Sequence, residues 1–433
     1  MNRRVLVLTH GFLPWGGAAS ERVARFCCHL RSYGWEPFIL CASEDSFHLF
    51  DEPRAEELWQ DWQCMRIGDH ATWRAYRLAG SIGVARAVRG LLTLTTGFPD
   101  IYRCWAEKCK AVAEQMCNSV QPTVLYSCSP PNSVHLIGMH LKHRFEIPWI
   151  MDLRDAWRGN RRARYLTPWH RRVAFQQYAH CIRLAGRIIA NSDKLAEMIT
   201  EHLGGLPRKV EVITNGYEES LFAAATPKQL LSGGMRTILY SGTTFHGFVV
   251  DVFKQISLAL DRLKADDAIR LVMVGESAGS LANATAFGPI SMGYQSQFDV
   301  PGLLLGADVL VLMMPAPAKE VGSATISLKT YGYVRSGRPI VYIGPDAANW
   351  QLLSQFPGTY KYEYGAWDDI AIKLIDLCKQ REDWTQDRLH RIMRFSWQTL
   401  TGNLAAAFES ALQPSSVQVE ACPTRAPLCQ GDL

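Results

Sequence analysis

The chain has 433 residues, of which 48% are hydrophobic and 20% are charged, and its formal net charge is +5. The length predicts two or three domains of ordinary size, and the composition excludes a disordered, collagen-like or disulfide-stapled miniprotein. No stretch of the sequence approaches the roughly 20 uncharged apolar residues that span a bilayer. The excess of Lys and Arg falls in residues 1–220, which fits either an acidic ligand or anionic membrane surface, or a chance asymmetry of a solvated surface.

The sequence contains twelve cysteines, with neither a C-x-x-C pair nor a zinc-ligand spacing. We therefore expect buried free thiols in a reducing cytoplasm and no bound metal. The opening residues, Met1 to Leu8, hold only a short apolar run without a following cleavage site, so we expect no signal peptide.

Short apolar strands alternate with amphipathic helices along the first half of the chain. A strand at 4–8, a helix at 18–33 and a strand at 35–41 form a βαβ unit, which predicts a parallel sheet with helices on both faces. Residues 45–118 are predicted to be mostly helical and irregular. Further strands are predicted at 123–127, 149–153, 187–191 and 210–214, with helices at 132–144, 168–185 and 193–203.

A second alternating set begins after residue 235. Its strands are predicted at 237–240, 269–274, 307–313 and 339–343, and its helices at 249–264, 295–306, 327–336, 346–355 and 366–380. Ligands favour the carboxyl ends of parallel strands, so both sets would present loops to a cleft between them. The predicted organisation is an N-terminal Rossmann-like domain (1–222), a Pro/Ser/Gly linker (223–235), a C-terminal domain (236–383), a final helix (384–412) and a disordered tail (413–433).

Two stretches of the first half carry candidate site residues. Gly16 and Gly17 precede a helix, where backbone N–H groups can approach a phosphate, although the spacing is not G-x-G-x-x-G and a simple turn is the alternative. Asp152, Arg154 and Asp155 follow a buried strand, where charges are costly unless they serve a site or pair with one another. A structural Arg154–Asp155 pair is the alternative for that segment.

Two stretches of the second half are candidates for anion binding. The loop after the strand at 237–240 supplies small and hydroxyl residues with one histidine, namely Ser241, Gly242, Thr243 and His246. Ser327 and Lys329 stand at a predicted helix N-terminus, where a cation and hydroxyls suit an anion. A structural His246, and a Ser327 N-cap beside an exposed Lys329, are the alternatives.

The segment 158–172 is rich in arginine with interleaved aromatic residues. Such a pattern fits single-stranded nucleic acid, an anionic lipid surface, a phosphorylated acceptor or a solvated loop. Beside a cleft, the lipid surface or the acceptor is favoured. We therefore predict no nucleic-acid partner and a peripheral membrane contact through this segment.

Four stretches in order form a larger pattern: Val5–Pro14 with Gly16-Gly17, Asp152–Trp157 (D-x-R-D-x-W), Ile189–Ser192 with Ile213–Tyr217, and Ser327–Tyr333 with Gly337–Val341. With these stretches the chain resembles the family 4 glycosyltransferases, retaining enzymes of the GT-B fold, over nearly all of residues 3–412. The resemblance implies two Rossmann-like domains facing a cleft, with the final helix crossing back onto the first domain. Because the first domain is basic, we expect a cytoplasmic enzyme of cell-surface polysaccharide or glycoconjugate synthesis.

The resemblance implies transfer of a sugar, with retention, from a nucleotide-sugar co-substrate to a hydroxyl of a glycan, lipid-linked sugar or small molecule, with no required metal or cofactor. The donor would lie mainly on the second domain and the acceptor mainly on the first. Gly16, Gly17, Ser241, Gly242 and Lys329 would hold the diphosphate. In the same reading, Asp152 or Asp155 would orient the sugar or the acceptor hydroxyl, and Arg154 would hold these acids in place.

The sequence departs from the family pattern at two sites. The two glutamates that most members carry are replaced by Ala324 and Gly332, and Thr243 and His246 stand where an Arg and a Lys are usual. Lys329, helix dipoles and backbone N–H groups would then meet the diphosphate charge. The alternatives are a natural-product glycosyltransferase, a non-catalytic sugar- or partner-binding protein, and a nucleotide-sugar epimerase.

Overall fold

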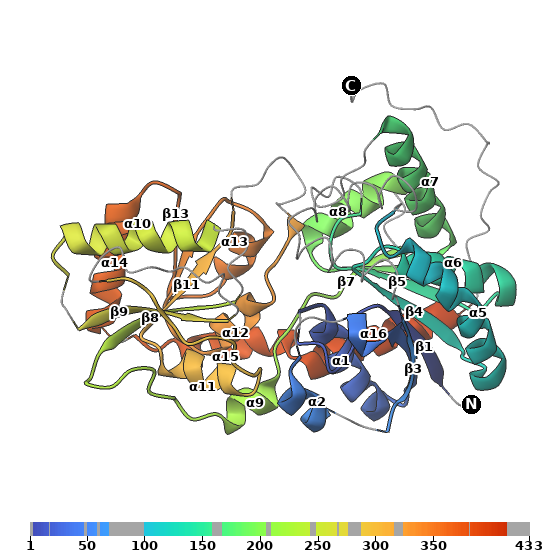
Figure 1. The fold of residues 1–433 in the computed structure, drawn as a ribbon, viewed down its shortest axis with the longest axis horizontal. Coiled ribbons are helices and arrows are strands. Elements are labelled where there is room, and N and C mark those ends of the chain that lie inside the picture. Colours follow the sequence, from blue (N-terminus) through green and yellow to red (C-terminus); the bar gives the residue numbers. More distant parts are fainter. Residues whose placement is uncertain are drawn as a thin grey trace.

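The computed structural model describes residues 3–16, 18–46, 50–58, 61–68, 99–157, 167–204, 209–242, 248–265, 268–275, 287–315, 324–380 and 382–413. It contains two parallel sheets, each belonging to its own lobe (Figure 1). The first sheet has the order β3-β2-β1-β4-β5-β6-β7 and the second has the order β10-β9-β8-β11-β12-β13. The predicted pair of doubly wound parallel sheets is confirmed.

The strands of the first sheet are β1 Arg4–Thr9, β2 Glu36–Ala42, β3 Gln63–Ile67, β4 Val124–Ser129, β5 Trp149–Leu153, β6 Arg187–Ala190 and β7 Val210–Val212. Its helices are α1 Ala18–Leu30, α2 Glu52–Leu58, α5 Arg103–Val120, α6 Val134–Phe145, α7 Pro168–Leu184 and α8 Asp193–His202. Alternate residues of β1 enter different cores: Leu6 and Leu8 pack on one face and Val5 and Val7 on the other. A strand buried on both faces needs such a continuous apolar run.

The second sheet consists of β8 Arg236–Ser241, β9 Ile269–Val274, β10 Ile290–Ser291, β11 Val309–Met313, β12 Ile340–Ile343 and β13 Thr359–Tyr362. The helices that come after β7 in the chain are α9 Glu219–Ala224, α10 Phe248–Arg262, α11 Asp299–Gly306, α12 Lys329–Arg335, α13 Ala348–Leu353, α14 Trp367–Gln380, α15 Thr385–Ile392 and α16 Trp397–Leu412. Two further cores cover the two faces of this sheet, with Leu310 in one and Val309 and Val311 in the other.

The chain returns from the second lobe to the first through α16, as predicted (Figure 1). The Trp397 ring packs edge-on against Phe26 of α1 with ring centres 5.4 Å apart, and Phe408 packs against Trp35 at 5.0 Å. The predicted single helix over 384–412 is wrong, because α15 and α16 are separate helices. Ser396 between them is extended, bridges to Tyr217 and caps α16 with its side chain.

Three further differences concern local structure. The strands β3, β10 and β13 were not predicted, and each lies at an edge of its sheet. Residues 69–98, part of the mostly helical stretch expected over 45–118, lie outside the described residues, as does the tail after residue 413. Among the helices that the structure describes, none has the length and apolar character required to cross a membrane.

Candidate functional site

The carboxyl end of β8 meets the first residue of α12. Gly242 directly follows β8 with a φ of +143°, and a Cβ placed there would lie 2.1 Å from Lys329 Nζ. No L side chain fits this conformation and this space, so glycine is required. Gly275, after β9, packs equally closely, because its Cβ would lie 2.3 Å from the Gly242 carbonyl oxygen. The Gly242 backbone and the Lys329 ammonium are thereby brought together.

Lys329 has an unusual electrostatic environment. Its ammonium lies 3.9 Å from the centre of the Tyr240 ring. Burial lowers the pKa of Lys329 from 10.5 to about 7. Among the hydrogen bonds and ion pairs of the described residues, Lys329 takes part in none through its ammonium. A desolvated cation without a counter-ion is unfavourable in the free protein and well suited to an anionic ligand.

The backbone N–H groups of the two serines near Lys329 donate to other residues of the protein. The Ser241 backbone N–H donates to the Tyr333 hydroxyl at 2.7 Å, and the Ser327 backbone N–H donates to Asn349 Oδ1 at 2.8 Å. The alternative of a Ser327 N-cap is wrong, because α12 has Leu328 at this position without a side-chain cap. Thr243 and His246 lie outside the described residues.

Asn349 is a structural residue of the site that the sequence analysis missed. It is fully buried and its Oδ1 also accepts a hydrogen bond from Thr330 Oγ1 at 2.9 Å. It thus holds the first turn of α12, which contains Lys329. An amide beside the apolar residues Ala348 and Trp350 was the available signal, since a buried amide needs partners.

The first glycine loop is held tightly by its own domain. Gly11 allows the Trp15 ring to fold back on it, since a Cβ at this position would lie 2.2 Å from the ring. Arg66 of β3 donates from Nη2 to the Leu13 carbonyl oxygen at 2.6 Å. Gly16 is buried beside these residues, and Gly17 lies outside the described residues.

Asp152 lies in the interior of the first domain and forms a buried ion pair with Arg22 of α1. The Asp152 carboxylate accepts from Arg22 Nε at 2.9 Å and from Arg22 Nη2 at 3.2 Å, and also from the Tyr126 hydroxyl. Arg22 donates in addition to the carbonyl oxygens of Ile213 at 2.7 Å and Thr214 at 2.6 Å. This geometry departs from the predicted substrate-orienting role, because both carboxylate oxygens already have partners. Asp152 fastens α1 to the sheet.

Arg154 and Asp155 follow β5 at its carboxyl end, and both are partly buried. The Nε and Nη1 atoms of Arg154 are buried without a hydrogen-bond partner, and no ion pair joins Arg154 to Asp155 or to another acid of the described ranges. The alternative of a structural Arg154–Asp155 pair is therefore not found. Like Lys329, Arg154 is a cation without a counter-ion in the described part of the chain.

Contacts between the domains bring the two carboxyl edges to the same interface. Asp51, whose N–H donates to the Pro14 carbonyl oxygen, accepts hydrogen bonds from Tyr294 and Ser296 of the second domain, both at 2.9 Å. A second contact forms where Ser192 Oγ, at the start of α8, donates to the Ala324 carbonyl oxygen at 2.6 Å. The sequence analysis missed Asp51, which has no local motif.

A chain of contacts continues from Tyr294 to Lys329. The adjacent Gly293 accepts from the Gly275 N–H at 2.8 Å, and Gly275 packs on Gly242, which lies against Lys329. The first glycine loop and Lys329 are therefore linked through residues at one side of the interface. By contrast, a cavity of about 340 Å³ lies at the opposite, amino end of β8, beside Arg236, and forms no part of this site.

The remaining predictions concern cysteines, metals and the basic segment. The ten cysteines that the structure describes are all free, and within the same residues no three His, Cys, Asp or Glu side chains are grouped as metal ligands. Of the segment 158–172, residues 158–166 lie outside the described residues. The rest exposes Trp169, with 61% of its surface accessible, together with Arg171 and Arg172.

Residues 17–216 match the family model described as Glycosyl transferase 4-like domain. Among solved structures, a glycosyltransferase from Rickettsia africae ESF-5 is similar with a TM-score of 0.65 and 13% identity, covering 96% of this chain and 100% of that one. Anabaena Alr3699/HepE in complex with UDP-glucose has a TM-score of 0.59 and 14% identity, covering 94% and 99%.

WaaG, a glycosyltransferase involved in lipopolysaccharide biosynthesis, has a TM-score of 0.59 and 11% identity, covering 94% and 99% of the two chains. No curated protein matches the sequence. Residues 17–216 thus resemble a glycosyl transferase 4-like domain, and the chain has the GT-B fold that the sequence analysis predicted. The family match and the fold together support a glycosyltransferase of the GT-B type.

Proposed function

We propose that this protein transfers a glycosyl group, with retention, from a nucleotide-sugar to an acceptor hydroxyl in cell-surface polysaccharide or glycoconjugate synthesis. The observation that carries the proposal is the Lys329 ammonium, which lies against the Gly242 backbone and has no counter-ion among the residues that the structure describes. A nucleoside diphosphate is the anion that a glycosyltransferase must hold and release. The Anabaena structure contains UDP-glucose, which supports a uridine nucleotide as the first donor to test.

Charge stabilisation at the leaving group supplies the catalysis. When the bond between the anomeric carbon and the diphosphate oxygen breaks, negative charge grows on the diphosphate, and a fixed cation nearby stabilises that charge. Diphosphate binding would raise the lowered pKa of Lys329 and keep it protonated. The acceptor oxygen bonds to the anomeric carbon on the same face, and its proton passes to the departing diphosphate oxygen. No protein nucleophile is then required.

The first domain would supply the acceptor side. Arg154, with its unpartnered Nε and Nη1 atoms, would bind an anionic or hydroxyl-rich group of the acceptor, and the adjacent Asp155 would orient the reacting hydroxyl. We place the reaction at the cytoplasmic face of a membrane, because Trp169 and Arg171 are exposed in the basic segment 158–172. A lipid-linked sugar is then the acceptor to test first.

The proposal does not require the two family glutamates. The Ala324 carbonyl oxygen is engaged by Ser192, and a Cβ on Gly332 would contact Leu304 and Phe222 at 3.5 and 3.6 Å. Neither position offers an acid to a ribose. Nucleoside recognition would therefore rest on other groups of the second domain.

The test is release of nucleoside diphosphate from a panel of nucleotide-sugars, with and without lipid-linked and soluble acceptors. We expect release only when donor and acceptor are both present. Lys329→Ala should reduce turnover by about 10²-fold or more, as the loss of one preorganised electrostatic contact does. Lys254→Ala is the matched control, since Lys254 is exposed on α10, and it should leave turnover unchanged.

Each of the following outcomes would contradict the proposal. Conversion of the donor without an acceptor would indicate an epimerase. Binding of a donor without turnover on any acceptor would indicate a non-catalytic binding protein. Full turnover by the Lys329 variant would remove Lys329 from the mechanism.

A further inference from the structure

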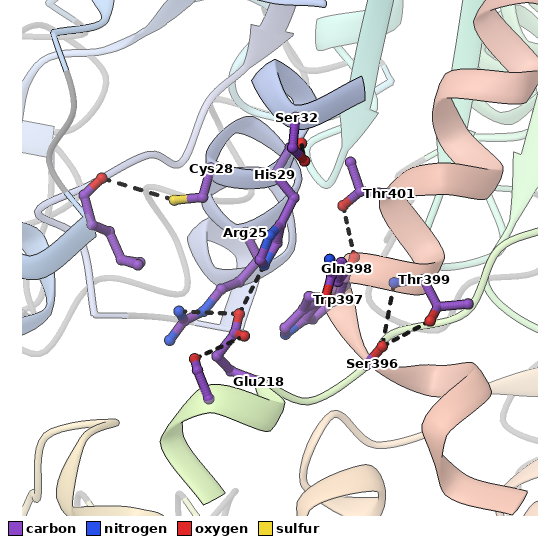
Figure 2. Close-up of polar contacts among 12 residues, drawn as sticks. Arg25, Cys28, His29, Ser32, Glu218, Ser396, Trp397, Gln398, Thr399 and Thr401 are labelled. Atoms are coloured by element: carbon purple, nitrogen blue, oxygen red, sulfur yellow. Dashed lines mark hydrogen bonds and ion pairs between the residues drawn. The ribbon is translucent and has the colours of Figure 1, made fainter. Parts of the chain in front are cut away.

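Two neighbouring acids lie where the chain leaves the first domain, and each binds a helix of a different domain. Glu218 Oε2 lies 3.0 Å from His29 Nε2 and 3.4 Å from Arg25 Nη1, both on α1 (Figure 2). Glu219 forms a two-bond ion pair with Arg335, the last residue of α12, with Nε–Oε2 at 2.7 Å and Nη2–Oε1 at 2.6 Å. Consecutive residues of the crossing segment thus hold α1 and α12.

These two helices carry the two halves of the candidate site. The first glycine loop leads into α1, and α12 begins with Lys329. Both acids contact their helices away from the amino ends that face the site, so a change in the angle between the domains would shift one amino end relative to the other. At 1.5 Å per residue, the arm from Arg335 to Lys329 is about 9 Å, and a rotation of about 10° would move the ammonium by about 1.5 Å.

The two segments that cross between the domains are hydrogen-bonded to each other, and this pairing fixes the positions of Glu218 and Glu219. The outgoing and returning segments pair at Tyr217 and Ser396, where Tyr217 N–H donates to Phe395 O at 3.1 Å and Trp397 N–H donates to Tyr217 O at 2.9 Å. Gly216 permits the close approach, because a Cβ there would lie 2.3 Å from the Phe395 oxygen. Figure 2 shows α1, the start of α9 and the start of α16 meeting at this point.

The ion pairs are partly shielded from solvent. The side chains of Arg25 and Glu218 are 3% and 10% exposed, and those of Arg335 and Glu219 are 11% and 28% exposed. Although burial by itself raises the pKa of Glu218, His29 and Arg25 lower it below its ordinary value. Both pairs are therefore less screened than surface pairs, which contribute little.

We infer that Glu218 and Glu219 form an interdomain clamp, in which adjacent carboxylates set the position of α1 relative to α12. They are positioning residues, and the consequence for catalysis rests on the function proposed above. The clamp itself is a statement about domain geometry and can be tested without turnover.

The test compares Glu219→Arg, Arg335→Glu and the double charge swap by small-angle scattering, donor affinity, kcat and KM. Each single variant should change the scattering curve and lower kcat by 10- to 100-fold, because a misplacement of about 1 Å can cost this much. Donor Kd should stay within about threefold, since Lys329 and Gly242 belong to one domain. The double variant should recover most of the original scattering curve and most of kcat. Asp368→Asn is the control, because it breaks the Arg262 pair of α10 and α14 inside the second domain.

Unchanged scattering and kcat in both single variants, or no recovery in the double variant, would overturn the clamp. If a charge reversal fails to fold, Glu219→Gln, checked by circular dichroism, replaces it with the same criteria. If the unaltered protein shows no turnover with any donor and acceptor, the proposed function fails. The scattering comparison then tests the clamp independently of catalysis.

Discussion

Replacement of Lys329 by methionine should stabilise the free protein and abolish donor binding. The ammonium is desolvated, has only the Tyr240 ring beside it and lacks a counter-ion in the described residues. Methionine keeps most of the apolar stem and removes the charge. Stability and function therefore oppose each other at this position, as they do at many active sites.

The magnitude follows from the lowered pKa. A fall from 10.5 to about 7 corresponds at pH 7 to an upper bound of about 4 kcal/mol against the folded state, at about 1.36 kcal/mol per pKa unit. Because Lys329 keeps partial contact with solvent, we expect a gain of about 1–3 kcal/mol for Lys329→Met. The unfolded state binds the extra proton between pH 7 and pH 10.5, so the gain is full below pH 7 and falls to less than half of this by about pH 9.

Urea unfolding at pH 6, 7.5 and 9 measures the gain, with Lys254→Met as the control at an exposed lysine. Calorimetric titration with UDP measures donor binding, which should be lost in Lys329→Met and should weaken above pH 7 in the unaltered protein. A variant that is less stable than the unaltered protein at pH 6, or that still binds UDP equally well, would refute the reasoning.

Three further substitutions separate structural from ligand-binding roles. Asp152→Asn should lower the free energy of unfolding by about 3–5 kcal/mol, because it leaves Arg22 as an unpaired buried charge; a loss below about 1 kcal/mol in urea unfolding would contradict this. Gly242→Ala should weaken UDP binding at least tenfold by titration, since the added Cβ would lie 2.1 Å from Lys329 Nζ, and equal affinity would place the donor elsewhere. Arg154→Gln should not lower the free energy of unfolding, because Arg154 Nε and Nη1 are buried without partners, yet it should lower kcat/KM for the acceptor tenfold or more; a destabilised variant with normal kinetics would make Arg154 structural.

The elements that the sequence did not predict are short and lie at sheet edges. Strands β10 and β13 are partly exposed on both faces, and β3 is similar. An edge strand has a neighbour on only one side and needs no continuous apolar run, so periodicity gives it little signal. The break before α16 has the same kind of cause, because Ser396 leaves the helical conformation to pair with Tyr217, a residue of the other crossing segment.

The candidate site was predictable only in part. Lys329 and Gly242 were chosen for their chemistry and lie together in the structure. Asp152, chosen by the same reasoning from the D-x-R-D-x-W motif, instead pairs with Arg22. Both Lys329 and Asp152 were chosen because they are charged residues that follow or begin a predicted element. They differ in whether a residue distant in the sequence supplies the opposite charge.

The sequence by itself determined the architecture of this protein, because buried parallel strands require continuous apolar runs and their crossover helices require an apolar stripe, and both patterns are local. Only the tertiary structure decided which charges are neutralised and which are left for a ligand. Arg22 reaches Asp152 across 130 residues of chain, while Lys329 finds no acid within the described part. Ion pairing depends on distances in space, and no pattern along the chain records them.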